Sequence, residues 1–336
     1  MERRCRGRQA HRLMRCVITH PGACCSRTKG AYHQELQDAR SNVGGCLRGA
    51  YLRPWGRAMM IEFGPVHTVL KKEVSDNIRN KWIILLTIIF AFLTLAASVL
   101  AGGGSLGGLE ETVTTLMSIS MILIPLISIM LGYSTISGED EDGSLAVLLS
   151  YPIKRGEVFI GKFLGLGIVI ALATAVGFGV SGIVIGLSKS ATPWGSYAAF
   201  ISLSVLLGLL YLSVSMCFSA LFKRRVASLG AGILLFFWST IYGTVLMGIY
   251  FATGGSMSDF TSANPTIPDW IWQSIYFSPM DMNQTASMLV FNIERAFGFA
   301  IEVPSFVDLA SIIGAHLVWI IVPLIIAYLA FERRDI

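Results

Sequence analysis

The stretch WIILLTIIFAFLTLAASVLA, Trp82–Ala101, runs without a single charged residue. A helix needs about 20 apolar residues to cross the ~30 Å hydrocarbon core of a bilayer. Within that core only a helix pairs all of its backbone amides inside one segment. Five more stretches of this kind follow, at Val113–Ser134, Phe163–Leu187, Ala198–Phe222, Val226–Ala252 and Leu309–Phe331. The sequence therefore predicts an all-α, polytopic membrane protein with six transmembrane helices.

The basic residues that flank these stretches lie almost entirely on one side of the predicted membrane. The expected inner connections carry Lys71, Lys72, Arg79, Lys81, Lys154, Arg155, Lys162, Lys223, Arg224, Arg225, Arg333 and Arg334. The expected outer connections carry only Lys189 and Arg295. Loops rich in Lys and Arg stay in the cytoplasm. We therefore expect the chain to cross the membrane six times with both termini in the cytoplasm.

Residues 1–58 differ in composition from the rest of the chain. They hold 12 of the 26 basic residues, 3 of the 21 acidic residues and five of the six cysteines. They contain no apolar run long enough for a signal peptide and no sustained helical or strand period. The cysteine spacing fits no usual pair of zinc ligands, and a basic arm for nucleic acid or lipid headgroups is the alternative. We expect residues 1–58 to be disordered or a mis-assigned upstream segment, and residues 60–336 to form the membrane domain.

An amphipathic helix is expected between Met60 and the first membrane span. Its apolar residues recur at spacings of three and four, at Phe63, Val66, Leu70, Val74 and Ile78. Such a helix lies in the membrane interface, with its apolar face toward lipid and its basic residues at the headgroups. A plain continuation of the first span is the alternative.

The outer connection, residues 253–308, is too long for a simple turn. Two amphipathic or apolar stretches, 267–277 and 281–301, predict short helices at the outer interface, with Trp270 and Trp272 at headgroup depth. Its methionines could bind Cu(I) through their thioethers, although packing of the loop helices is the expected role. These methionines are Met257, Met280, Met282 and Met288.

The most specific stretch is GEDEDGSLAVLLSYPIKRGEVFIGK, Gly138–Lys162. Four consecutive acids end at Gly143, a short apolar helix follows, and Pro152 ends it. A short cytoplasmic helix between two spans can seat in a groove of a soluble partner and pass movement to the membrane helices. The alternative is a solvated loop whose helix rests on the membrane.

This stretch resembles the cytoplasmic coupling segment of ABC transporter permeases of the type-2, exporter-like family. In that segment an acidic residue is commonly followed by Glu, then Gly, then Thr or Ser. The pattern Leu-x-x-Leu-Leu-x-x-Pro-x-x-Arg comes directly after these residues. The likeness extends over about residues 60–336, including the six spans, the charged turn 223–225 and the ending FERRDI. Within the family, the chain resembles most the permease group linked to maturation of multicopper enzymes such as nitrous-oxide reductase.

The resemblance implies a permease subunit in a prokaryotic cell membrane, surrounded by membrane lipid. It implies two ATPase subunits that bind ATP beneath the coupling segments, and a second permease copy or paralogue, with no role for nucleic acid. It implies that the ATPase docks on Glu139, Glu141, Gly143, Leu145, Leu148, Leu149, Pro152 and Arg155.

The chain is not expected to be an enzyme, and no catalytic residue, metal site or cofactor is assigned to it. Gly156–Lys162 fits G-x-x-x-x-G-K, but Phe163 stands where a phosphate loop needs Ser or Thr. ATP-driven transport would therefore need a separate ATPase; the alternatives are an ATPase-independent channel and a membrane-anchored assembly factor. A secondary carrier would need inverted repeats and intramembrane charges. His316 is expected to bond a neighbouring carbonyl or hydroxyl, and a role in the transport pathway is the alternative.

Overall fold

The computed structural model describes residues 63–102, 109–188, 194–256, 268–293, 295–296, 299–300, 304 and 306–334. The chain divides into two units, Met1–Met60 and Ile61–Ile336, and every described residue belongs to the second. The expectations for residues 1–58 and for Met257 lie outside the described residues.

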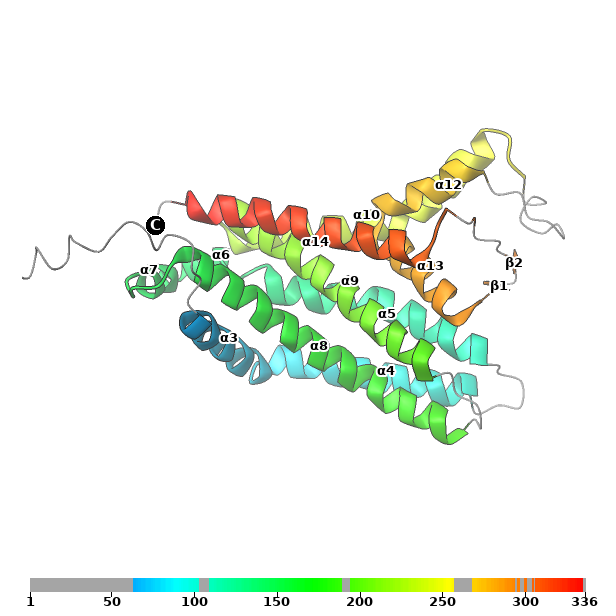
Figure 1. Cartoon of the computed structure of the whole chain (residues 1–336), viewed down its shortest axis with the longest axis horizontal. Helices are drawn as coiled ribbons and strands as arrows, with labels where there is room; N and C mark the ends of the chain where they lie inside the picture. Colours follow the sequence, from blue (N-terminus) through cyan, green and yellow to red (C-terminus); the bar gives the residue numbers. More distant parts are fainter. Residues whose placement is uncertain are drawn as a thin grey trace, which may run out of the picture. The chain divides into compact units, whose positions relative to one another are not determined.

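Helices make up nearly all of the described structure (Figure 1). They are α3 (Phe63–Ile78), α4 (Lys81–Gly102), α5 (Leu109–Gly132), α6 (Ser137–Glu141), α7 (Ser144–Leu149), α8 (Arg155–Ser188), α9 (Trp194–Leu221), α10 (Arg225–Ala252), α12 (Asp269–Ser274), η3 (Ile275–Phe277), α13 (Pro279–Phe291) and α14 (Leu309–Glu332). Six segments of the described chain, containing α4, α5, α8, α9, α10 and α14, are long and apolar enough to cross a membrane. The predicted all-α fold and its six candidate spans are confirmed.

The α9 helix is the centre of the helix bundle. It contacts α5, α8, α10, α13 and α14, and Leu207, Leu210 and Tyr211 on it are fully buried. By contrast, the outer faces of α4, α10 and α14 expose large apolar side chains; Leu234, for example, is 72% exposed. A helix that is apolar all round is stable where protein or lipid covers each face, which fits a membrane-embedded bundle.

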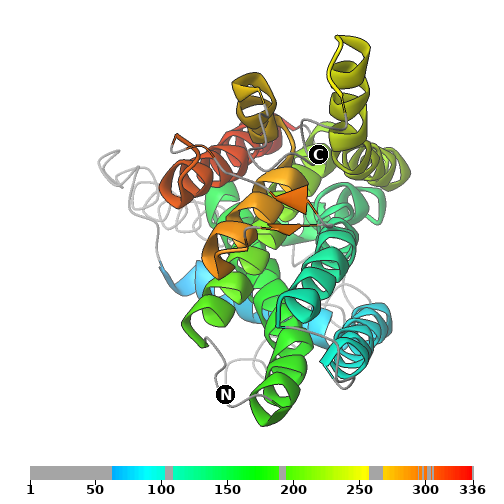
Figure 2. The same cartoon turned by 90° about the vertical axis from the view of Figure 1, so that its right-hand side faces the viewer.

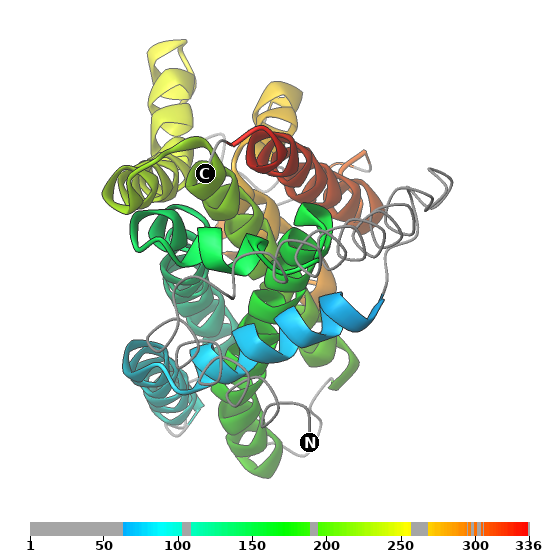
Figure 3. The same ribbon diagram turned by 90° about the vertical axis from the view of Figure 1, so that its left-hand side faces the viewer.

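The α8 helix begins at Arg155, eight residues before the predicted start of the third span at Phe163. Lys162, which the sequence placed in a charged loop, therefore lies inside a helix. This early start brings α8 against α3, which crosses it (Figure 3). A Cβ added at Gly161 would lie 2.8 Å from the Val69 Cβ, and one at Gly165 would lie 2.8 Å from the Glu73 Cβ. The pair Gly161-x-x-x-Gly165 therefore admits α3 to close contact with α8.

The predicted amphipathic helix is present as α3, but part of its apolar face meets protein. Val66 and Val69 are buried against α8, and Glu73 is buried as well, although neither Val69 nor Glu73 belonged to the predicted apolar set. Ile78, at the end of the helix, is 49% exposed. This side of α3 therefore faces α8, whose glycines admit it closely; the position of α3 in the membrane interface stays a prediction.

The outer connection contains the α12, η3 and α13 helices (Figure 2). The predicted helix over 267–277 is confirmed by α12 and η3. The predicted helix over 281–301 is confirmed only as far as Phe291, because Asn292 has a left-handed φ of 51° and ends α13. Beyond it, β1 (Arg295–Ala296) and β2 (Phe299–Ala300) form a two-residue antiparallel pair.

Several side chains of this outer connection are part of the protein core. Trp272 is buried at 8% exposure, while Trp270 is 41% exposed; their position at headgroup depth stays a prediction. Three methionines on α13 pack in apolar clusters, as the packing interpretation expects; they are Met280, Met282 and Met288.

Candidate functional site

The segment from Ser137 to Arg155, which we call the coupling segment, joins the second and third candidate spans. Its two short helices, α6 and α7, are separated by Gly143, whose φ of +70° is unfavourable for any residue with a Cβ. The Ser144 hydroxyl donates to the Glu139 carbonyl at 3.2 Å across this turn. The glycine thus sets the angle at which α7 leaves α6.

Ser219, near the end of α9, holds the beginning of α6. Its hydroxyl accepts hydrogen bonds from the backbone N–H groups of Ile136 and Ser137, each at 3.0 Å. The side-chain oxygens of Ser137 and Ser219 are 3.2 Å apart. Since the first N–H groups of a helix have no partner within the helix, this buried serine satisfies two donors and fixes α6 to the central helix.

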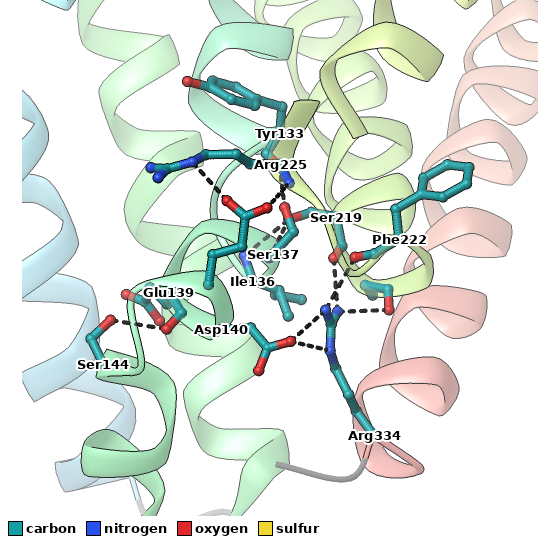
Figure 4. A network of polar contacts seen from close by, with 12 residues as sticks. Tyr133, Ile136, Ser137, Glu139, Asp140, Ser144, Ser219, Phe222, Arg225 and Arg334 are labelled. Atoms are coloured by element: carbon teal, nitrogen blue, oxygen red, sulfur yellow. Dashed lines mark hydrogen bonds and ion pairs between the residues drawn. The ribbon is translucent and has the colours of Figure 1, made fainter. Parts of the chain in front are cut away.

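Arg334, just after α14, connects α6 with the end of α9 (Figure 4). Its Nη2 and Nε lie 2.7 and 3.1 Å from Oδ2 of Asp140. The same guanidinium donates to the last carbonyls of α9, those of Ser219, Ala220 and Phe222, each at 3.1 Å. Arg334 is only 9% exposed. One cation therefore caps a membrane helix and neutralises an acid of the coupling segment.

Lys162 of α8 joins the coupling segment to α3. Its Nζ lies 2.7 Å from Oε1 of Glu139 and 2.7 Å from Oε1 of Glu73. The Lys162 side chain is 2% exposed, and those of Glu73 and Glu139 are 11% and 22% exposed. Lys72, which is more exposed, lies 3.9 Å from Glu139. A buried cation between two carboxylates makes the relative positions of α3, α6 and α8 depend on one another.

Arg225, the first residue of α10, pairs with the last two acids of the run. Its Nε lies 2.7 Å from Glu141 Oε2, and its backbone N–H donates to Glu141 Oε1 at 3.1 Å. Its Nη2 lies 3.4 Å from Asp142 Oδ1. This last pair is about half exposed and contributes little to stability. The acids 139–142 therefore form ion pairs with basic residues of four separate parts of the chain, namely α3, α8, α10 and the C-terminal end.

Arg155 closes the coupling segment at the start of α8. One of its nitrogens, Nη1, donates to the carbonyls of Phe331, Glu332 and Arg334 at 3.0, 3.0 and 2.8 Å. Carbonyls at the end of a helix have no partner within it, so Arg155 caps α14. Both ends of the coupling segment are thus fastened to the C-terminal helix.

The α7 helix turns one apolar side inward and another outward. Leu145 is fully buried in a cluster with residues of α5, α8, α9 and α14, and Leu149 packs against the same cluster. Leu148 is half-buried. Val147 and Tyr151 are 62% and 60% exposed. Leu145 therefore does not present its side chain to a partner in this conformation, because that face of α7 packs on the helix bundle.

The residues assigned to ATPase docking by resemblance thus differ in burial and in their contacts within the chain. Glu139, Glu141 and Arg155 form contacts within the chain, Leu145 is buried, and Gly143 and Pro152 are exposed. The sequence reading missed the basic partners Lys162, Arg225 and Arg334. Four consecutive acids repel one another less when cations lie nearby, and basic residues at helix ends on the same predicted side were the available signal.

Two other sequence features have plain structural explanations. The stretch Gly156–Lys162, which resembles a phosphate loop, lies wholly within α8. Nδ1 of His316 is 2.9 Å from the Ile312 carbonyl, as expected for a bond to a neighbouring carbonyl, and its buried Nε2 has no hydrogen-bond partner. Among the described residues, no group of three His, Cys, Asp or Glu side chains could hold a metal ion.

The chain is similar to known transport proteins over most of its length. Residues 67–336 match the sequence profile of the ABC-2 family transporter protein. A probable ABC transporter permease protein NosY of Pseudomonas aeruginosa is 30% identical over 283 residues, which cover 81% of this chain and 99% of that protein. The protein of the same name from Stutzerimonas stutzeri is 30% identical over 283 residues, with 80% and 98% covered.

These matches agree with the resemblance noted in the coupling segment, and both relatives carry the name of one permease. The six candidate spans of the described chain and the family together make this a multi-pass membrane protein. The chain belongs to the ABC-2 family of ABC transporter permeases.

Proposed function

We propose that this chain is the transmembrane permease subunit of an ABC transporter, which moves its substrate with ATP hydrolysed by a separate ATPase subunit. The chain itself acts as a non-enzymatic transport subunit, and ATP is bound by the partner. The family, whose members named above are described as permeases, supports an ATPase partner in general. The transport pathway would be formed by two permease units, each above one ATPase unit.

The observation that carries the proposal is the geometry of the coupling segment. Ion pairs fasten it to α3, α8, α10 and the C-terminal end, so a push on the segment is transmitted to several helices at once. Yet its outer side exposes Val147 and Tyr151. Exposed aromatic and aliphatic side chains are typical anchors of a protein interface. We therefore place the ATPase contact on Val147 and Tyr151, with the half-buried Leu148 beside them.

The proposed orientation has the coupling segment and both termini in the cytoplasm. The segment contacts the end of α9, the start of α10 and the C-terminal residues, so these parts lie on one side of the membrane (Figure 3). The basic turn 223–225 and Arg333 and Arg334 belong to this side, and basic residues favour the cytoplasm. The relatives are bacterial, which supports a prokaryotic cell membrane.

The proposal is tested by titrating the ATPase subunit onto the permease in lipid nanodiscs. Val147→Asp places a charge on the exposed side of α7 and should weaken binding by about 30-fold, the effect of losing one central anchor of ~2 kcal/mol. Tyr151→Asp should act in the same direction.

Thr68→Asp is the matched control, because it adds the same charge at an exposed, β-branched residue of α3, outside α7. Helical content should be unchanged in all variants. Equal affinity of the wild type and both α7 variants, or no binding of any ATPase to the wild type, would favour a channel or a membrane-anchored assembly factor.

A further inference from the structure

An apolar groove lies between α4 and α8 on the outside of the bundle. Its volume is about 340 Å³, and it is lined by Ile78, Ile83, Ile84, Thr87, Ile88, Val169, Leu172, Ala173 and Val176. Thr87 is the one polar residue of the lining, and its hydroxyl already donates to the Ile83 carbonyl at 2.8 Å. The groove therefore offers no free hydrogen-bonding group and suits a purely apolar occupant.

The lining residues of the groove follow one another along α4 and α8. Its lining on α4 runs from Ile83 to Ile88, about 7.5 Å along the helix. Its lining on α8 runs from Val169 to Val176, which is about 10 Å. The floor is formed by the buried Ile83, Val169 and Ala173, while Ile84 and Ile88 form an exposed wall. An apolar lining of this length can hold part of an extended hydrocarbon chain.

One end of the groove carries positive charge. Ile78, the last residue of α3, lines this end, and the turn that follows it contains Arg79 and Lys81. Both basic side chains are exposed, and neither forms an ion pair with another described residue. Trp82 beside them is 68% exposed, and exposed tryptophans prefer the headgroup region. The turn is thus suited to the membrane–water boundary.

We propose that this groove binds one anionic phospholipid of the inner membrane leaflet. One acyl chain lies along the groove between α4 and α8, and the phosphate lies between Arg79 and Lys81. Charge complementarity selects this occupant, because each Lys or Arg near the surface favours an anionic lipid. A second permease copy seated here would bury two unpaired cations at its edge, at a large desolvation penalty.

The test uses the full chain in nanodiscs with equal amounts of phosphatidylglycerol and phosphatidylcholine that share the same acyl chains. After extraction into mild detergent, native mass spectrometry counts the lipids that remain bound. The wild type should retain one phosphatidylglycerol in preference to phosphatidylcholine. Arg79→Gln combined with Lys81→Gln should weaken this retention about 25-fold, or ~5-fold for each charge.

Lys71→Gln is the matched charge control. It removes an exposed lysine from α3 about 10 Å from Ile78 and should leave retention unchanged. Thr87→Phe fills the groove and should abolish retention with both charges still present. Thr68→Phe adds the same ring at an exposed threonine of α3 that has the same bond to the carbonyl four residues earlier, and it should have no effect.

Several outcomes would overturn the proposal. Equal retention of the two lipids would show that Arg79 and Lys81 do not select an anionic headgroup. Full retention in Thr87→Phe would show that the acyl chain does not bind in the groove. A single-chain species recovered in place of a diacyl lipid would show that the occupant is a detergent or fatty acid. Cross-linking of an Ile88→Cys variant to a second copy would show that protein covers the groove. Helical content is measured for every variant, because an unchanged value excludes misfolding as the cause of a lost lipid.

Discussion

Lys162→Met should destabilise the protein more than any other single change in the ion pairs of the coupling segment. The substitution keeps most of the side-chain volume but removes the cation between Glu73 and Glu139, to each of which Lys162 Nζ lies 2.7 Å. Two carboxylates are then left facing one another in a site where the lysine was 2% exposed.

The size of the effect follows from burial. Removing one partner of a buried ion pair costs about 3–5 kcal/mol, because the remaining charge stays desolvated and unpaired. The carboxylates are partly exposed, at 11% and 22%, so we expect the lower end, about 3 kcal/mol. Glu73→Gln leaves Lys162 paired with Glu139 and should cost only about 1–2 kcal/mol.

Thermal unfolding in detergent, followed by circular dichroism, measures these differences. A loss of about 3 kcal/mol should lower the melting midpoint by roughly 6 °C or more. The Lys162→Met, Glu73→Gln double variant should melt above Lys162→Met alone, since one stranded carboxylate is gone; the coupling should be at least ~1 kcal/mol. Lys71→Met, an exposed lysine on α3, is the control. Equal melting of Lys162→Met and this control would refute the buried triad.

Three further predictions concern other parts of the molecule. Gly143→Ala should lower stability by about 1–2 kcal/mol, because its φ of +70° disfavours a Cβ, while Gly179→Ala, with no atom within 4 Å, should be neutral in the same melting assay. Burial raises the pKa of Asp281 above its ordinary 3.8, and a hydrogen bond from Ser278 partly opposes this shift. The folded state therefore binds the proton more tightly than the unfolded state does. As a result, the stability of the fold decreases as the pH rises through and beyond 3.8. Asp281→Asn should therefore raise the melting midpoint relative to the wild type more in neutral than in acidic buffer, an effect that the exposed Asp269→Asn should not reproduce. In intact cells, an impermeant thiol reagent should label Gln273→Cys but not Ser144→Cys, and the opposite pattern would reverse the proposed orientation.

The six candidate spans could be predicted from sequence because each has a long uncharged run, and such a run is stable as a helix in lipid whatever its neighbours are. Their ends were less predictable. The third span was predicted to start at Phe163, because the basic residues Lys154, Arg155 and Lys162 are typical of a loop. In the structure the helix continues back to Arg155, because carboxylates from other segments neutralise Lys162.

The position of the coupling segment could be predicted, but its inner and outer sides could not. Leu145, Leu148 and Leu149 share one face of a helix, and periodicity alone does not say whether that face meets a partner or the chain itself. Tertiary packing decides this by burying Leu145 and leaving Val147 exposed. Ion pairs across long sequence separations, such as Asp140 with Arg334, are likewise determined by the fold and have no local pattern.

The most direct test of ATP-driven transport is ATP turnover in proteoliposomes that contain the ATPase subunit with and without this permease. The wild-type permease should change the turnover of the ATPase, and Thr68→Asp should behave as the wild type. Val147→Asp, with intact helical content, should return turnover to the level of the ATPase alone. Full wild-type turnover with Val147→Asp, or no effect of the wild-type permease, would contradict coupling through the exposed side of α7.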